Sequence, residues 1–302
     1  MQTDDRGVSL WCEETDEDYR DQAALGTGAP GGQLRAAWDP SVSGRRVIQR
    51  LLHVEERYAP SPLYVGLIQQ EPQRREELAK WTLEVCCDCG CDEAVFPLSV
   101  SLMDRFLSVT LSTPVLPYCL AAACVLIASK LSECDNITSN ALCAAAEYNF
   151  LPANLREMER VVLATLRWDT AAVTPQDFLP HFLASLGERN EEDSTTLRRH
   201  SDTLATLCAC DSRFLGASPS LVAAASLNCA FRGLGNREHS RLHPLSSTLA
   251  DLCQADPVVL QYYSEMIEHA LRQRLSNRPA DKGDEFEDER AGTPTDMREI
   301  DF

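Results

Sequence analysis

Two patterns of ionisable side chains in this sequence could carry chemistry: a cysteine cluster and a pair of opposite charges within apolar helices. The six histidines are scattered and form no motif of a catalytic centre, which needs several convergent groups. The stretch "CCDCGC" (86–91) could hold zinc, but zinc usually takes paired ligands from two separated segments, and no second pair has a standard spacing. We therefore expect no metal, no cofactor and no catalytic residues, and interpret the cluster as a helix end followed by a turn at Gly90. A cysteine-dependent redox or zinc protein is the weakest alternative.

The opposite charges stand at the edges of two apolar helical patterns. The stretch "CLAAACVLIASKLSE" (119–133) is apolar on every side until Lys130, so it is typical of a buried helix with a charge at its border. In "NLREMERVVLATLRW" (154–168), Glu159 lies within an apolar stripe. The pair can be a structural salt bridge or a snorkelling lysine, or it can be a charge pair presented at a protein interface.

The segments that carry these charges, and most of the chain around them, have the apolar periodicity of helices. This periodicity predicts helices near 45–57, 72–88, 97–109, 114–131 and 152–167. "TPQDFL" then begins a second set, because Thr174 is a capping residue and Pro175 suits a first helical turn. The Ala-rich stretch "SPSLVAAASLNCAF" is a second candidate for a central helix, and no β pattern of any length is present.

Composition divides the chain into four parts. We expect a disordered acidic arm (1–44), a first helical domain (45–170), a second helical domain (174–275) and a disordered acidic tail (276–302). The arm contains a formal GxGxxG (Gly26, Gly28 and Gly31), but no strand precedes it, so it is not a dinucleotide-binding fingerprint.

The charge balance excludes whole classes of partner. With 46 acidic and 28 basic residues the net charge is −18, and no basic stripe suits nucleic acid or an acidic membrane surface. The first residues lack the apolar run of a signal peptide, and no apolar run reaches the ~20 residues of a membrane span. We expect a soluble, intracellular protein.

Three features have spacings that match a known family: "LMDRFLS" (102–108), "LIASKL" (126–131) and Glu159. Together they resemble the cyclin box. The stretches "WTLEVCCDCGCDEAVFPLSVSLMDRFLS" and "LRWDTAAVTPQDFLPHFL" resemble D-type cyclins in particular, and the similarity covers about residues 45–275. The resemblance implies an all-α protein with two consecutive cyclin-fold helical domains.

The same resemblance implies roles for individual residues. Lys130 and Glu159 match the pair at the centre of the surface that binds the kinase, and Arg75 and Asp104 match an ion pair that steadies the box. Cys119 departs from the family, since it replaces a leucine that packs there. The expected partner is a cyclin-dependent kinase of the G1 class.

Both ends of the chain add family motifs. "LWCEE" places Leu10, Cys12 and Glu14 in the LxCxE pattern by which D-type cyclins engage retinoblastoma-type pocket proteins; an extended strand would put the three side chains on one face. In the tail, Thr293 with Pro294 resembles the site whose phosphorylation triggers nuclear export and degradation.

A docking patch for RxL motifs is only partly retained. The family form MRAIL-x-x-W corresponds here to "RREELAKW", in which Leu78 and Trp81 are kept but Arg74 and Glu77 replace two apolar walls. We expect RxL-bearing substrates and Cip/Kip-type inhibitors to bind weakly.

These features favour a non-catalytic regulatory subunit that activates a G1-class kinase, directs it to pocket proteins and promotes the G1/S transition, in nucleus and cytoplasm. The alternative is a cyclin-fold scaffold of the general-transcription-factor type without kinase activation. The net charge of −18 argues against that alternative.

Overall fold

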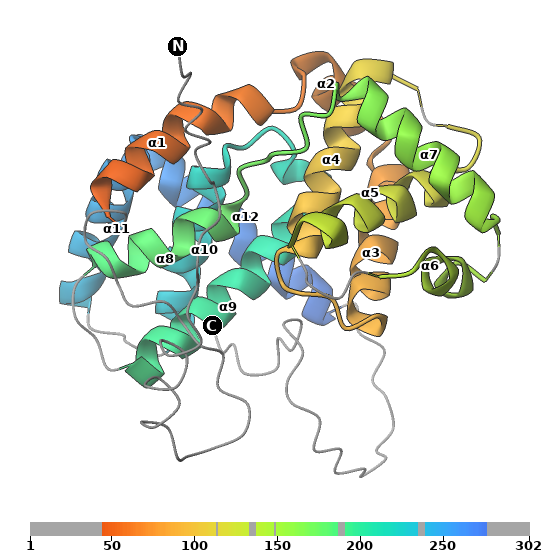
Figure 1. Cartoon of the computed structure of the whole chain (residues 1–302). Coiled ribbons are helices and arrows are strands. Elements are labelled where there is room, and N and C mark those ends of the chain that lie inside the picture. Colours follow the sequence, from red (N-terminus) through yellow and green to blue (C-terminus); the bar gives the residue numbers. More distant parts are fainter. Residues whose placement is uncertain are drawn as a thin grey trace, which may run out of the picture. The chain divides into compact units, whose positions relative to one another are not determined.

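The computed structural model describes residues 44–276, except for 113, 133–136, 148, 187–190 and 235–238, and the side chains of 191–193 and 239–244 are also left out. Every regular element in this part of the chain is a helix, as predicted (Figure 1). None of these helices is long and apolar enough to cross a membrane. The predicted motif residues Leu10, Cys12, Glu14 and Thr293 lie outside the described residues.

The first helical set surrounds one buried helix. It comprises α2 (Pro62–Gln70), α3 (Pro72–Asp88), α4 (Val95–Thr110), α5 (Pro117–Ser132), α6 (Ser139–Ala145) and α7 (Pro152–Thr165). Helices α3, α4 and α7 pack around α5, whose residues 119–129 are each at most 3% exposed. The small alanines of α5 let the neighbouring helices approach on every side, which confirms the prediction of a central helix.

The second set repeats this arrangement around α10 (Pro219–Gly233). Its other helices are α8 (Pro175–Ser185), α9 (Glu191–Cys210), the short η3 (Ser212–Phe214), α11 (His239–Cys253) and α12 (Pro257–Ser276). Helix α8 starts where the sequence predicts: the Thr174 N–H donates to Asp177 Oδ2 at 2.7 Å, and Pro175 opens the first turn.

Each of the two hydrophobic cores contains residues from the other half of the chain. Helix α1 (Arg45–Glu55), followed by η2 (Glu56–Tyr58), packs against α8, α10 and α11 (Figure 1). Ile48 of α1 is buried in the core of the second set. Conversely, Cys210 and Leu215 from the second half of the chain are buried in the first core. The two domains are therefore not separate packing units.

The segment that joins the domains is fixed by polar contacts. Arg105 of α4 donates to the carbonyl oxygens of Asp169 (2.7 Å) and Ala171 (2.6 Å). The Asp169 carboxylate in turn accepts from Arg57 at 2.6 Å and from the Tyr58 hydroxyl at 3.3 Å. These bonds hold the entry to α8 against the first domain.

Two short helices were not predicted from the periodicity. The Ser61 hydroxyl caps α2 by accepting from the Tyr64 N–H at 3.3 Å, and Pro62 occupies the first turn. Similarly, Thr138 caps α6 by accepting from the Ala141 N–H at 3.2 Å. Both starts carry ordinary capping signals, but the helices are too short to show a repeating apolar stripe.

Candidate functional site

The predicted charge pair is formed, and it lies at the surface. Lys130, in the last turn of α5, donates to a carboxylate oxygen of Glu159 on α7. The side chain of Glu159 is 14% exposed, whereas that of Lys130 is 46% exposed. The C-terminal end of a helix favours a cation, so α5 itself helps to hold Lys130 in place.

Helix α7 fixes Glu159 by burying the apolar stripe within which Glu159 lies. Leu155 and Val162 are fully buried, and Met158 and Leu163 pack against the same core, as the stripe predicted. An exposed ion pair contributes only about 0–1 kcal/mol to folding stability. This pair is therefore poorly explained as a folding device alone.

An exposed tryptophan follows α7 and was missed by the sequence analysis. Trp168 is 73% exposed, and both Arg167 (φ 54°) and Trp168 (φ 61°) adopt the left-handed backbone region. The Trp168 N–H donates to the Leu163 carbonyl (2.8 Å) and the Arg167 N–H to the Ala164 carbonyl (3.1 Å), which ends the helix. Left-handed backbone at non-glycine residues is a form of strain that is often found at functional sites. The sequence does not indicate this left-handed helix end, because no glycine is present there.

The Arg75–Asp104 pair is buried and fully bonded. Arg75 donates from Nε (3.1 Å) and Nη2 (2.7 Å) to the two oxygens of Asp104, and the Tyr64 hydroxyl adds a third bond at 2.8 Å. The side chains of Arg75 and Asp104 are 3% and 6% exposed. The remaining guanidinium nitrogen, Nη1, donates to the Ala209 carbonyl of α9 at 2.7 Å. The pair thus joins the two helical sets, which is more than the internal role that the resemblance implied.

Arg75 stays charged although it is buried. Burial by itself lowers the pKa of Arg75, but the charge and hydrogen bonds of Asp104 outweigh burial, so the pKa is raised. The pKa of Tyr64 is also raised, first by burial and then by the Asp104 carboxylate beside it. Arg75 therefore stays a cation and Tyr64 a neutral donor.

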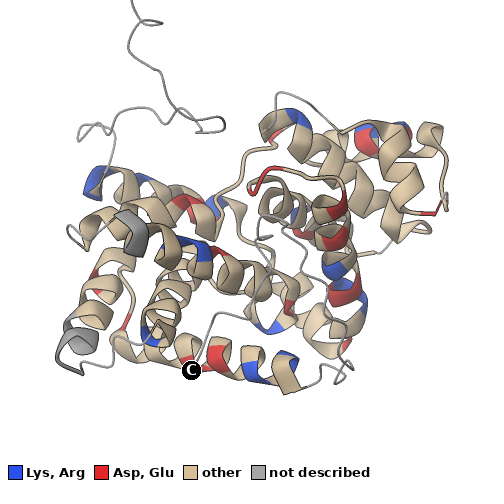
Figure 2. Cartoon of the chain, turned by 90° about the horizontal axis from the view of Figure 1, so that it is seen from below, with Lys and Arg blue, Asp and Glu red and all other residues tan. Residues whose placement is uncertain are grey.

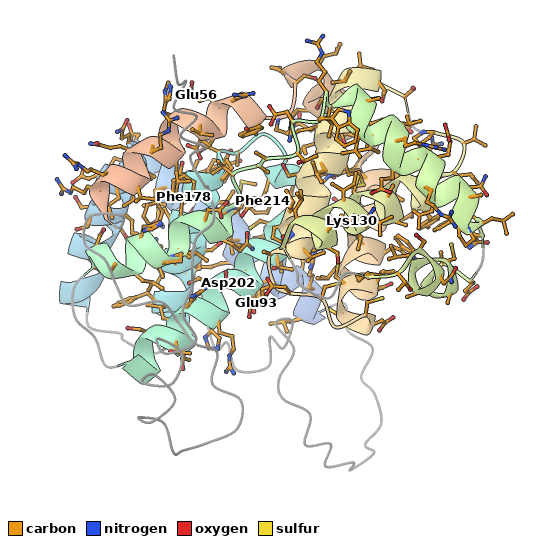
Figure 3. The ribbon with its side chains drawn as sticks, in the orientation of Figure 1. Glu56, Glu93, Lys130, Phe178, Asp202 and Phe214 are labelled. Carbon is orange, nitrogen blue, oxygen red and sulfur yellow. The ribbon has the colours of Figure 1, made fainter. Side chains whose placement is uncertain are left out.

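A carboxylate of the first domain also acts electrostatically on a carboxylate of the second. Asp202 of α9 lies near Glu93, which precedes α4 (Figure 3). Burial raises the pKa of Asp202 to about 6; Arg198, 3.6 Å away, opposes the shift and Glu93 adds to it. The Asp202 carboxyl group therefore exchanges its proton at about pH 6.

The partly retained docking patch borders a cavity of about 810 Å³. Arg74, Glu77 and Leu78 line it, together with residues from α2, the segment before α5 and the first turn of α5: Leu67, Ile68, Leu111, Val115 and Tyr118. Trp81 does not line the cavity itself but packs edge-on against Tyr118, with ring centroids 5.2 Å apart. Arg74 is 78% exposed, so it lies at the rim of the cavity.

The cysteine cluster ends helix α3. Gly90 has φ +65°, the Cys91 N–H donates to the Cys86 carbonyl (2.9 Å) and the Gly90 N–H to the Cys87 carbonyl (3.1 Å). This is a Schellman motif, and it confirms the predicted turn at Gly90. Within the described residues, no group of three or more Cys, His, Asp or Glu is placed to hold a metal ion.

The charged residues of the described helices do not gather by sign. In the view of Figure 2, Lys and Arg are interspersed with Asp and Glu along the helices.

Comparisons with known proteins agree with this geometry. The family models for the cyclin N-terminal domain and the cyclin C-terminal domain match residues 46–171 and 173–283. The G1/S-specific cyclin-D1 of Danio rerio is 37% identical over 88% of this chain and 94% of that protein. The G1/S-specific cyclin-D2 of Rattus norvegicus is 36% identical over 89% of this chain and 96% of that protein. Among solved structures, a viral cyclin from herpesvirus saimiri matches with a TM-score of 0.66 and 24% identity, covering 76% of this chain and 97% of that one.

Proposed function

The chain belongs to the cyclin family and, within it, to the G1/S-specific D-type cyclins, and on this premise we propose that it binds and activates a cyclin-dependent kinase of the G1 class. The observation that carries the proposal is the pair of half-exposed Lys130 and largely buried Glu159 on α5 and α7. The chain acts as a regulatory subunit, and the kinase supplies all of the catalytic residues.

The pair is suited to holding the end of a helix of the kinase. A lysine has three N–H donors, so Lys130 can keep its bond to Glu159 and still donate to carbonyl oxygens of a docked helix. Glu159 fixes the position of the ammonium group before binding, which lowers the entropy that binding costs. Trp168, exposed just after α7, offers apolar area to the same partner. Binding here favours the active arrangement of the kinase helix and activation loop.

The two ends of the chain serve recruitment and turnover in this proposal. Leu10, Cys12 and Glu14 bind retinoblastoma-type pocket proteins and bring them to the kinase, which promotes the G1/S transition. Phosphorylation of Thr293 triggers export and degradation, so the protein is found in nucleus and cytoplasm. The charges of Arg74 and Glu77 weaken docking of RxL motifs and of Cip/Kip-type inhibitors.

The test of the kinase proposal is a charge reversal with a matched control. Lys130→Glu places two carboxylates side by side, and losing a paired interface charge costs about 2–5 kcal/mol of binding free energy. Lys80→Glu is the control, because Lys80 is 51% exposed and also pairs with a glutamate, Glu76 on its own helix. Each variant is expressed in dividing cells and purified, and co-purified kinase and phosphorylation of a pocket-protein fragment are measured.

We expect Lys130→Glu to lose both kinase and activity, and Lys80→Glu to keep both, with equal helical content in circular dichroism. If Lys130→Glu activates the kinase as well as the unchanged protein does, the pair is only a structural salt bridge and the proposal is wrong.

A further inference from the structure

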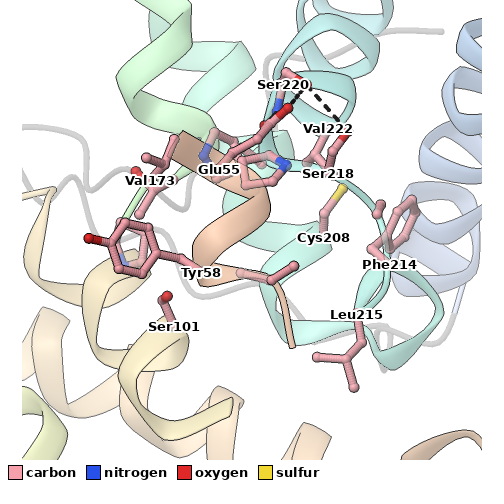
Figure 4. A pocket seen from close by; sticks show the side chains of 18 of the residues that line it. Glu55, Tyr58, Ser101, Val173, Cys208, Phe214, Leu215, Ser218, Ser220 and Val222 are labelled. Carbon is pink, nitrogen blue, oxygen red and sulfur yellow. Dashed lines mark hydrogen bonds between the residues drawn. The ribbon is translucent and has the colours of Figure 1, made fainter. Parts of the chain in front are cut away.

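A cavity of about 430 Å³ lies at the junction of the two helical sets (Figure 4). Its walls are mainly apolar and include Val100 of α4, Val173, Phe214, Leu215 and Val222. Small-molecule sites typically have volumes of about 300–1,000 Å³ and occur preferentially between domains. Neither Lys130 nor Glu159 lines this cavity, so it is separate from the proposed kinase surface.

Glu55 places a buried carboxylate on this cavity. Its side chain, at the end of α1, accepts from the Ser220 N–H (2.9 Å) and from the Ser220 hydroxyl (2.7 Å), as Figure 4 shows. The residue is 7% exposed, and within the described part of the chain no cation forms an ion pair with it. The N-terminal end of α10 compensates part of the charge. A buried carboxylate without a cation is nevertheless costly, and it favours a bound cation.

A second acceptor lines the same cavity. Gln176 Oε1 is buried and has no hydrogen-bond partner among the described residues. A buried acceptor left without a donor costs free energy, which a donor on a bound molecule would recover. Glu55 and Gln176 together therefore favour a ligand with two donor groups.

The cysteine on the wall does not suggest covalent chemistry. Cys208 is 2% exposed, and burial raises the pKa of its thiol well above the ordinary value. Only the thiolate is a strong nucleophile, so Cys208 contributes apolar surface instead. Binding in this cavity is therefore expected to be non-covalent.

We propose that the cavity binds a small aromatic amine, with its ring system against the valine and phenylalanine walls, its ammonium group donating to Glu55 and a second N–H donating to Gln176. The site does not depend on kinase activation. The apolar walls of the cavity favour an aromatic ring, and the acceptors on Glu55 and Gln176 favour a ligand with two N–H donors.

Tryptamine is a suitable probe, because it combines an aromatic ring, an ammonium group and an indole N–H. N-acetyltryptamine is the matched control, since it keeps the ring and the indole N–H but carries no charge. We expect calorimetry on the full chain to show tryptamine binding at least tenfold more tightly than N-acetyltryptamine. Glu55→Gln should remove about tenfold of the tryptamine affinity, or ~1.4 kcal/mol, and leave N-acetyltryptamine unchanged.

Two further variants keep the test decisive should Glu55→Gln fail to fold. Gln176→Met leaves the bonds between Glu55 and Ser220 intact and should weaken both probes severalfold. Ser101→Trp fills the cavity from α4 and should abolish binding of both, because Ser101 is half-buried on its wall. Equal affinities for the two probes, no saturable binding of tryptamine, or binding that survives Ser101→Trp would each overturn the proposal.

Discussion

Replacing Arg75 by Met is expected to be among the most damaging single changes in this fold. Arg75 is 3% exposed and makes two bonds to Asp104 and one to the Ala209 carbonyl. Its removal leaves a buried carboxylate for which, among the described residues, the Tyr64 hydroxyl is the remaining donor. Breaking one partner of a buried ion pair costs about 3–5 kcal/mol, a large part of the ~5–15 kcal/mol that stabilises a typical domain. The Ala209 carbonyl, in the last turn of α9, also loses its donor.

The measurement is urea unfolding of the purified full chain, followed by circular dichroism. Arg75→Lys keeps the charge but cannot make the forked contact or reach both Asp104 and Ala209, so it should lose less, about 1–3 kcal/mol. The triple change Arg75→Met, Asp104→Leu and Tyr64→Phe removes the charges and the lone hydroxyl together. It should recover much of the loss, because apolar replacements of a buried pair are often neutral. A loss below ~1 kcal/mol for Arg75→Met, or a triple variant no more stable than the single one, would refute the reasoning.

Three other predictions address the docking patch, the arm and the junction. Arg74→Met with Glu77→Ile should tighten RxL-peptide binding about tenfold or more, ~1.4 kcal/mol, in calorimetry, and equal affinities would contradict the proposed role of these charges. Cys12→Gly with Glu14→Lys should weaken capture of a pocket-protein fragment while co-purified kinase stays constant; joint loss of both would show that arm and box are coupled. Asp202→Asn should change the pH profile of stability. The pKa of Asp202 is raised from 3.8 to about 6, so the folded state holds the proton more tightly, and stability of the unchanged protein falls as pH rises through that interval. The variant should lack this fall in urea midpoints taken from pH 4 to pH 7, and two parallel profiles would exclude the shift.

The sequence was sufficient for features that follow from local pattern. The all-round apolar stretches predicted the central helices α5 and α10, and the charges at the borders of apolar faces predicted that Lys130 and Glu159 meet. The first inference rests on the rule that a helix apolar on every side is buried, and the second on the rule that a charge at a buried face requires a partner. The role of the pair in kinase binding stays a prediction.

Other features depend on tertiary packing and left no local signal. The bond from Arg75 to the Ala209 carbonyl joins residues from different helical sets, and nothing near Arg75 in the sequence indicates it. The same holds for Glu55, whose partner Ser220 lies at the start of α10. The helix predicted at 152–167 ends one residue before Trp168, and the exposure of Trp168 follows from the left-handed backbone that ends α7.

The position of α1 has a consequence for how the chain is made. Helix α1 is translated first of the described helices, yet the core that buries Ile48 is built from α8 and α10, which leave the ribosome more than a hundred residues later. At about 5–20 residues per second, this is a delay on the order of ten seconds. During that time the apolar face of α1 is exposed to solvent or to chaperones. The first core is also incomplete until Cys210 and Leu215 have been synthesised, so neither half is expected to finish folding before the ribosome has passed through most of the message.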